Sequence, residues 1–160
     1  MARQKMKKKI IIALTVLNLC FIWGNSALRP EISNAISDKV TEILGGEVTG
    51  GSEEAESSAM TWLTSGHVRK LAHMAEFAAL AVLLAIGASA AGCRMKDVWS
   101  QLLLIGVLTA LIDETIQIFS GRTSAVKDVW IDCGGFALGA AAAALLRYLR
   151  KRLRKRARAD

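Results

Sequence analysis

Residues 98–119, VWSQLLLIGVLTALIDETIQIF, are almost uniformly apolar until Asp113 and Glu114 interrupt the run near its end. About 20 apolar residues are enough for a helix to cross the hydrocarbon core of a bilayer. An aspartate at the centre of such a helix costs about 2.5 to 3.5 kcal/mol on insertion scales. We therefore expect a membrane span whose acidic side chains find partners on other helices.

Three further stretches have the same character, and together they predict an all-α membrane protein built as a four-transmembrane-helix bundle. They are residues 10–28, 70–93 and 128–146. The 52% hydrophobic content and the single proline also favour helical spans. A basic leader before the first stretch also fits a signal peptide, but Asn25 suits the −3 position of a cleavage site poorly. We expect one membrane domain, 10–146, followed by a basic tail, 147–160.

The basic residues predict how the chain is oriented. Of the 21 Lys and Arg, 15 lie in three segments, residues 1–9, 93–98 and 147–160, which alternate with the apolar stretches. The positive-inside rule places both termini and the 93–98 link in the cytoplasm. Directly after a span, the basic tail is expected to bind anionic lipids of the inner leaflet and not nucleic acid.

The long segment 29–69 then lies outside. Within it, apolar residues recur at helical spacing and predict an amphipathic helix in the outer interface: Ile32, Ile36, Val40, Ile43 and Leu44. Residues 45–58 follow as a glycine-rich acidic loop.

Ionisable side chains of three spans fall at a similar depth. Glu76 is six residues inside Lys70 and Asp113 is six residues before Phe119, so each lies about 9 Å from the outer boundary. Asp132 is about 6 Å deep by the same measure. We predict that these groups form one polar cluster in the outer third of the bilayer.

The helical spacing supports a shared facing. Arg69, His73 and Glu76 form one stripe, at i, i+4 and i+7. On the fourth span, Asp128 and Asp132 continue along one face into Gly135 and Gly139, a GxxxG pattern that allows close helix approach. The same face therefore carries polar residues at its outer end and small residues further in.

The cluster has two interpretations: ion pairs that hold the bundle together, or an outward pocket for a polar ligand. Lys127 adds a further cation nearby. His73, Glu76, Asp113 and Glu114 are the candidates for acid–base catalysis, although no nucleophile is obviously paired with His73. A metal site is disfavoured because Arg69, Lys70 and Arg122 would repel a cation, and no cofactor is expected.

Four blocks of this sequence resemble the VanZ-like family of bacterial membrane proteins. They are residues 23–26 (WGNS, with Ser33 and Ser37 beyond), 67–77 (HVRKLAHMAEF), 113–122 (DETIQIFSGR) and 128–135 (DVWIDCGG), with Gly139 beyond. The likeness covers about residues 17–146. It implies a four-span protein of the bacterial plasma membrane and a link to teicoplanin resistance.

The resemblance and the depth pattern select the same candidate binding residues: Arg69, Lys70, His73, Glu76, Asp113, Glu114, Gln117, Arg122, Asp128 and Asp132. The leading hypothesis is a cell-envelope protein whose outward cluster binds a lipid headgroup, a lipid-linked wall precursor or a glycopeptide. The alternatives are a membrane-embedded enzyme acting on a lipid-linked envelope intermediate, and a purely structural bundle. Transport is disfavoured because four spans leave little room for alternating access.

Overall fold

Four long helices dominate the computed structural model, which describes residues 2–29, 31–32, 35–36, 38–40, 65–121 and 125–157. They are α1 (Ala2–Ser26), α4 (Ser65–Ala91), α5 (Met95–Phe119) and α6 (Val126–Arg156). Each is long and apolar enough to cross a membrane, and the described residues contain no strand. The predicted all-α fold with four spans is confirmed. The predicted acidic loop lies outside the described residues, and so do Ile43 and Leu44 of the predicted interfacial helix. Ile32, Ile36 and Val40 of that helix lie in short helical segments that the structure describes.

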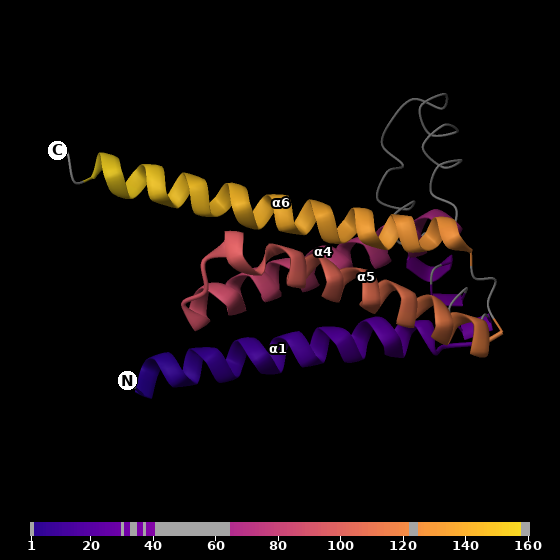
Figure 1. Ribbon diagram of the computed structural model, residues 1–160. Coiled ribbons are helices and arrows are strands. Elements are labelled where there is room, and N and C mark those ends of the chain that lie inside the picture. The colour runs from indigo at the N-terminus through magenta and orange to yellow at the C-terminus, as the bar shows by residue number, and fades with distance from the viewer. Residues whose placement is uncertain are drawn as a thin grey trace, which may run out of the picture.

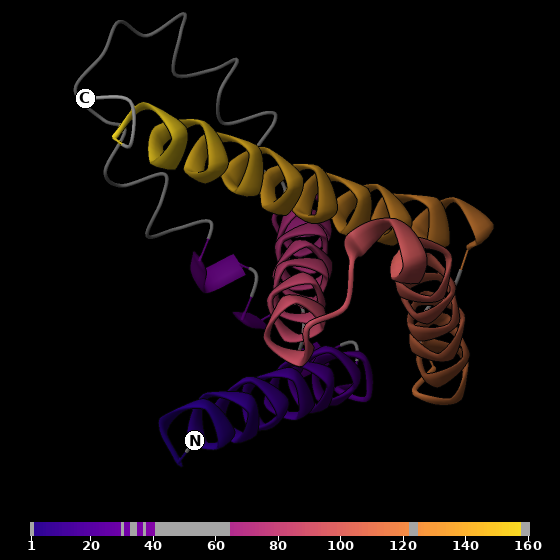
Figure 2. The same cartoon turned by 60° about the vertical axis from the view of Figure 1, so that its left-hand side comes forward.

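The four helices form a bundle in which α4 is the central element. Among the described helices, α4 contacts each of the other three, and its contact with α6 is the most extensive. Figure 2 shows α4 and α5 between α1 and α6. The start of α1, the α4–α5 link and the end of α6 lie at one end of the bundle, and the end of α5 and the start of α6 lie at the other (Figure 1). The three basic segments therefore share one end.

The surface of the bundle is apolar, and its interior is small. No more than 33% of the residues in the most apolar part of any of the four helices are buried within the chain. The large side chains that point outward include Leu104, Leu108 and Leu138. A surface of this kind is stable where lipid covers it. The protein is therefore a multi-pass membrane protein.

The apolar core lies between the helices, centred on Phe77 of α4 and Phe136 of α6. Both side chains are buried, and they cluster with Ile22 of α1 and Ala110 of α5. The ring of Phe136 also packs on Gly106, where an added Cβ would lie 2.9 Å from it. All four helices thus contribute to one core, and this fixes how each helix is rotated.

The GxxxG face of α6 packs directly on the backbone of α4. A Cβ added at Gly135 would lie 2.7 Å from the Cα of Met74, and one added at Gly139 would lie 2.6 Å from the Cα of Ala78. Real Cβ atoms essentially never approach so closely. Only glycine allows this separation, so the close approach expected from the sequence is confirmed.

Helix α6 continues into the basic tail, which the sequence pattern had not indicated. At 1.5 Å per residue its 31 residues extend about 46 Å, more than the roughly 30 Å of a hydrocarbon core. Arg147 donates a hydrogen bond to the carbonyl of Ala85 in α4. Arg154, Lys155 and Arg156 occupy the last turn, where cations are favoured by the helix dipole. Figure 1 shows this end of α6 beyond the other helices.

Replacing Gly139 by valine should destabilise the bundle by about 1–3 kcal/mol or more, because α6 must move away from α4 to admit the side chain. The midpoint of thermal unfolding of the detergent-solubilised protein measures the loss. Gly134→Val is the matched control, since nothing lies within 4 Å of a Cβ added at Gly134. Equal midpoints for the two variants would contradict the packing argument.

Candidate functional site

The last turn of α1 enters the polar cluster through Ser26, whose side chain is 0% exposed. Its hydroxyl donates a hydrogen bond of 2.6 Å to Oδ1 of Asp113 on α5. Its backbone carbonyl accepts one of 3.0 Å from the Ser120 hydroxyl, just after α5. Ser26 therefore ties the C-terminal end of α1 to the C-terminal end of α5.

Asp113 is wholly buried, and both of its carboxylate oxygens are hydrogen-bonded. The second oxygen, Oδ2, accepts a hydrogen bond of 2.8 Å from Nε2 of Gln117, one turn further along α5. The His73 ring nitrogen Nε2 lies 3.8 Å from the same oxygen. A buried carboxylate with this many donors loses little of what water would supply.

His73 of α4 lies between two carboxylates. Its Nδ1 is 3.1 Å from Oε2 of Glu76, while its Nε2 is 3.4 Å from the Ser26 hydroxyl. Because that hydroxyl donates its single proton to Asp113, it meets Nε2 as an acceptor. Both ring nitrogens thus face acceptors, an arrangement that a doubly protonated imidazolium satisfies in full. Asn25 completes the set by donating to Oε1 of Glu76 at 3.2 Å.

These six side chains form what we call the buried network: Asn25, Ser26, His73, Glu76, Asp113 and Gln117. It joins α1, α4 and α5. The sequence did not identify Asn25 and Ser26 as site residues, because neither carries a charge. Their signal was their place in the WGNS block at the C-terminal end of the first span.

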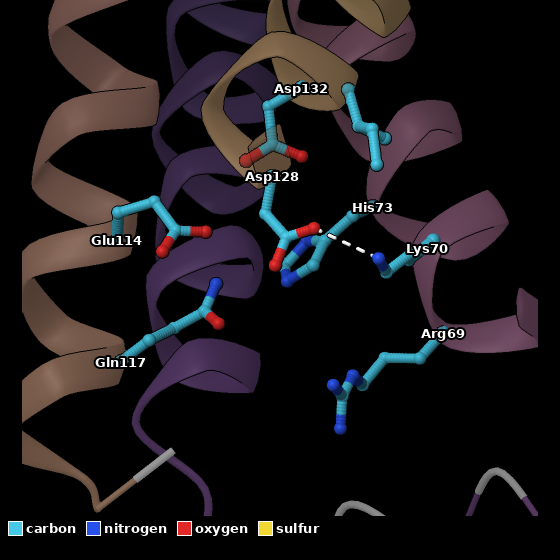
Figure 3. A pocket seen from close by; sticks show the side chains of 8 residues that line it. Arg69, Lys70, His73, Glu114, Gln117, Asp128 and Asp132 are labelled. Carbon is cyan, nitrogen blue, oxygen red and sulfur yellow. Dashed lines mark ion pairs between the residues drawn. The ribbon is translucent and has the colours of Figure 1, made fainter. Parts of the chain in front are cut away.

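A small polar pocket adjoins the buried network on the side of α6 (Figure 3). Its interior volume is about 20 Å³, room for roughly one water-sized group. Lys70 of α4 and Asp128 of α6 form an ion pair of 3.0 Å across it. The pocket is lined by Arg69, Lys70, His73, Glu114, Gln117, Asp128, Ile131 and Asp132.

Every predicted site residue that the structure describes lies in the buried network or lines the polar pocket. Arg122 lies outside the described residues. Lys127, which the sequence offered as a further cation, has an exposed side chain on the first turn of α6. Acidic and basic groups from separate spans therefore lie close together, as predicted.

The family model described as VanZ/LLP1 matches residues 10–147, which include most of all four helices. The chain belongs to the VanZ/LLP1 family. The resemblance seen in the sequence blocks is confirmed. Neither the search of curated proteins nor the search of solved structures found a match.

In this VanZ/LLP1 protein, His73 lies between the Ser26 hydroxyl and the Glu76 carboxylate. The same order of contacts links a nucleophile, a base and an orienting acid in hydrolases. The Ser26 hydroxyl, however, is wholly buried, and it donates its hydrogen bond to Asp113. A reacting carbonyl could not approach it. Ser26 is therefore not placed as an accessible nucleophile. Among the described residues, no three His, Cys, Asp or Glu side chains are arranged to hold a metal ion.

Replacing Ser26 by alanine should lower the free energy of unfolding by about 1–2 kcal/mol, because Asp113 loses a donor in a buried site. Unfolding in mixed micelles, followed by the loss of helical signal, measures the change. Ser89→Ala is the control, since the Ser89 hydroxyl donates only to the Ala85 carbonyl of its own helix. A loss for Ser26→Ala no larger than that for Ser89→Ala would show that the buried network contributes nothing to stability.

Proposed function

We propose that this VanZ/LLP1 protein resides in the bacterial plasma membrane and binds the polar headgroup of an outer-leaflet lipid or lipid-linked wall precursor. By holding that headgroup it would modulate susceptibility to glycopeptides such as teicoplanin. The observation that carries the proposal is the polar pocket, in which side chains of both charge signs from three helices line one hollow. Headgroups of envelope lipids carry the phosphates and carboxylates that such side chains recognise.

The buried network and the polar pocket differ in how their polar groups are satisfied, and this difference supports binding over a purely structural role. The buried network satisfies its own members, and it joins α1, α4 and α5. The pocket differs, because Oδ2 of Asp132 is buried there without a hydrogen-bond partner. A buried acceptor left unmet is costly, so it favours a ligand that brings a donor.

The basic side chains of the pocket would contact the anionic part of the headgroup. Arg69 and Lys70 belong to the early turns of α4, about 6 Å and 4.5 Å nearer its outer end than His73. A guanidinium can hold phosphate or carboxylate through two parallel hydrogen bonds, and an ammonium adds charge. The ion pair of Lys70 with Asp128 keeps the ammonium at the pocket before a ligand arrives.

The basic tail would bind the opposite face of the membrane. The side chains of Arg147, Arg150, Lys151, Arg154 and Lys155 line one hollow along the last turns of α6. Near an anionic membrane surface each basic residue contributes about 1 kcal/mol. Anionic lipids of the inner leaflet are therefore the proposed partners of this segment, and they would hold the bundle at a fixed depth.

Sidedness can be tested with cysteine labelling. In a variant that keeps Cys93 but has Cys20→Ala and Cys133→Ala, a membrane-impermeant maleimide should label Cys93 only after the cells are permeabilised. Cys93 is exposed beside the basic α4–α5 link, which the positive-inside rule assigns to the cytoplasm. A second variant, with Val126→Cys in a cysteine-free background, should label in intact cells, since Val126 is exposed at the other end. The reverse labelling pattern would mean that the pocket opens toward the cytoplasm, where outer-leaflet headgroups cannot reach it.

Loss of Lys70 should weaken the effect on glycopeptides. In a strain where the wild-type protein raises the minimum inhibitory concentration of teicoplanin, Lys70→Gln should abolish most of that rise. The expected cause is the loss of the cation for the anionic headgroup. Arg94→Gln serves as the control, because Arg94 is an exposed cation paired with Asp97 at the opposite end. Membrane abundance is measured by immunoblot, and an unchanged inhibitory concentration for Lys70→Gln at equal abundance contradicts the proposal.

A further inference from the structure

We propose that the polar pocket receives a primary ammonium group at Asp132, so that the bound headgroup is a zwitterion with its cationic end inward. This inference rests on the proposed headgroup binding and specifies its chemistry. The anionic part of the same headgroup meets Arg69 and Lys70. The ligand class is an amine separated by a short linker from a phosphate or carboxylate.

Asp132 is the residue that points to a cationic ligand. Its side chain is 2% exposed, it lines the polar pocket, and its Oδ2 has no hydrogen-bond partner. Two of the neighbouring basic side chains have partners of their own: Lys70 is 3.0 Å from Asp128, and His73 lies against Glu76 and Ser26. An ionised carboxylate in such surroundings is stabilised by a charged donor placed directly against it.

The polarity of the pocket agrees with a zwitterion. The acceptor-bearing side chains of Glu114, Gln117 and Asp132 come from α5 and α6, whereas Arg69 and Lys70 approach from α4 (Figure 3). Asp132 is also one helical turn deeper than Asp128, while Arg69 is one turn shallower than His73. A headgroup entering from the membrane surface would therefore meet Arg69 and the Lys70–Asp128 ion pair first and Asp132 last.

The size of the pocket selects among cations. An interior of about 20 Å³ has room for a group of about the size of a water molecule or an ammonium. A primary ammonium has three donors, and one of them can meet the unpartnered Oδ2 of Asp132. A trimethylammonium has none and is much bulkier. A metal ion is not favoured, because no three metal-ligating side chains are suitably arranged among the residues that the structure describes.

Two sources share this chemistry: the headgroup of an aminophospholipid and a free zwitterion such as ethanolamine phosphate. The test uses the purified full-length protein with short-chain phosphatidylethanolamine, its N-methylated series up to phosphatidylcholine, and phosphatidylglycerol. Affinities are measured by native mass spectrometry, and binding is assigned to the pocket when Lys70→Gln weakens it. Soluble ethanolamine phosphate is added as a competitor to separate the two sources.

Phosphatidylethanolamine should bind about tenfold more tightly than phosphatidylcholine, with a stepwise fall as methyl groups are added. Both lipids have the same net charge, so the basic tail cannot create this preference. Asp132→Asn should reduce the preference to less than about twofold, since the charged acceptor is lost. Asp97→Asn should preserve it, because Asp97 is an exposed carboxylate paired with Arg94 at the opposite end.

The outcomes separate this inference from the proposal beneath it. Equal pocket binding of phosphatidylethanolamine, phosphatidylcholine and phosphatidylglycerol would overturn the ammonium site while leaving headgroup binding intact. If none of the lipids bound in a Lys70-dependent manner, both would fall. Competition by ethanolamine phosphate would support a site that reads the headgroup alone, and selective lipid binding without competition would support one that also needs the acyl chains. Should Asp132→Asn fail to fold, the methylation series on the wild-type protein decides the matter.

Discussion

The hydrogen-bonded carboxylate of Asp113 is the constraint on which the rest of this structure depends. This side chain is wholly buried inside the bundle and out of reach of bulk water, so other side chains must supply its hydrogen-bond donors. Ser26 and Gln117 do so, and the first of them requires the end of α1 to meet α5. The meeting also brings Asn25 to Glu76 and the Ser26 hydroxyl to His73. One acid thereby determines how three helices are arranged at one end of the bundle.

A second constraint is steric and lies deeper in the bundle. Gly135 and Gly139 let α6 approach the backbone of α4 more closely than any side chain would allow. This separation places Asp128 within 3.0 Å of Lys70 and brings Asp132 to the polar pocket. Small residues and ionisable residues on one face of α6 therefore act together. The glycines set the distance between α6 and α4, and at that distance Asp128 reaches Lys70 and Asp132 lines the polar pocket.

The sequence predicted well where the spans lie and which side chains share a helix face, because both depend on short-range patterns. Hydropathy sets where a helix can cross a bilayer, and the 3.6-residue period sets which side chains share a face. The pattern that joined Arg69, His73 and Glu76 is of this kind. The helical continuation of α6 to Arg156 was missed because a basic run after a span has no apolar period to indicate it. The parts played by Asn25 and Ser26 were missed because an uncharged polar residue at the end of a span carries no cost that demands a partner.

By itself, the sequence determined that four apolar helices cross a membrane and that acids and bases from several of them lie at one depth. Only the tertiary structure decided who pairs with whom: Asp113 with Ser26 and Gln117, Glu76 with His73 and Asn25, Asp128 with Lys70. The physical reason is that hydropathy acts on each helix separately, whereas a hydrogen bond requires two atoms within about 3 Å. That distance depends on how the helices rotate and how closely they pack. Both are set by contacts between residues far apart in the chain, such as Gly139 with Ala78.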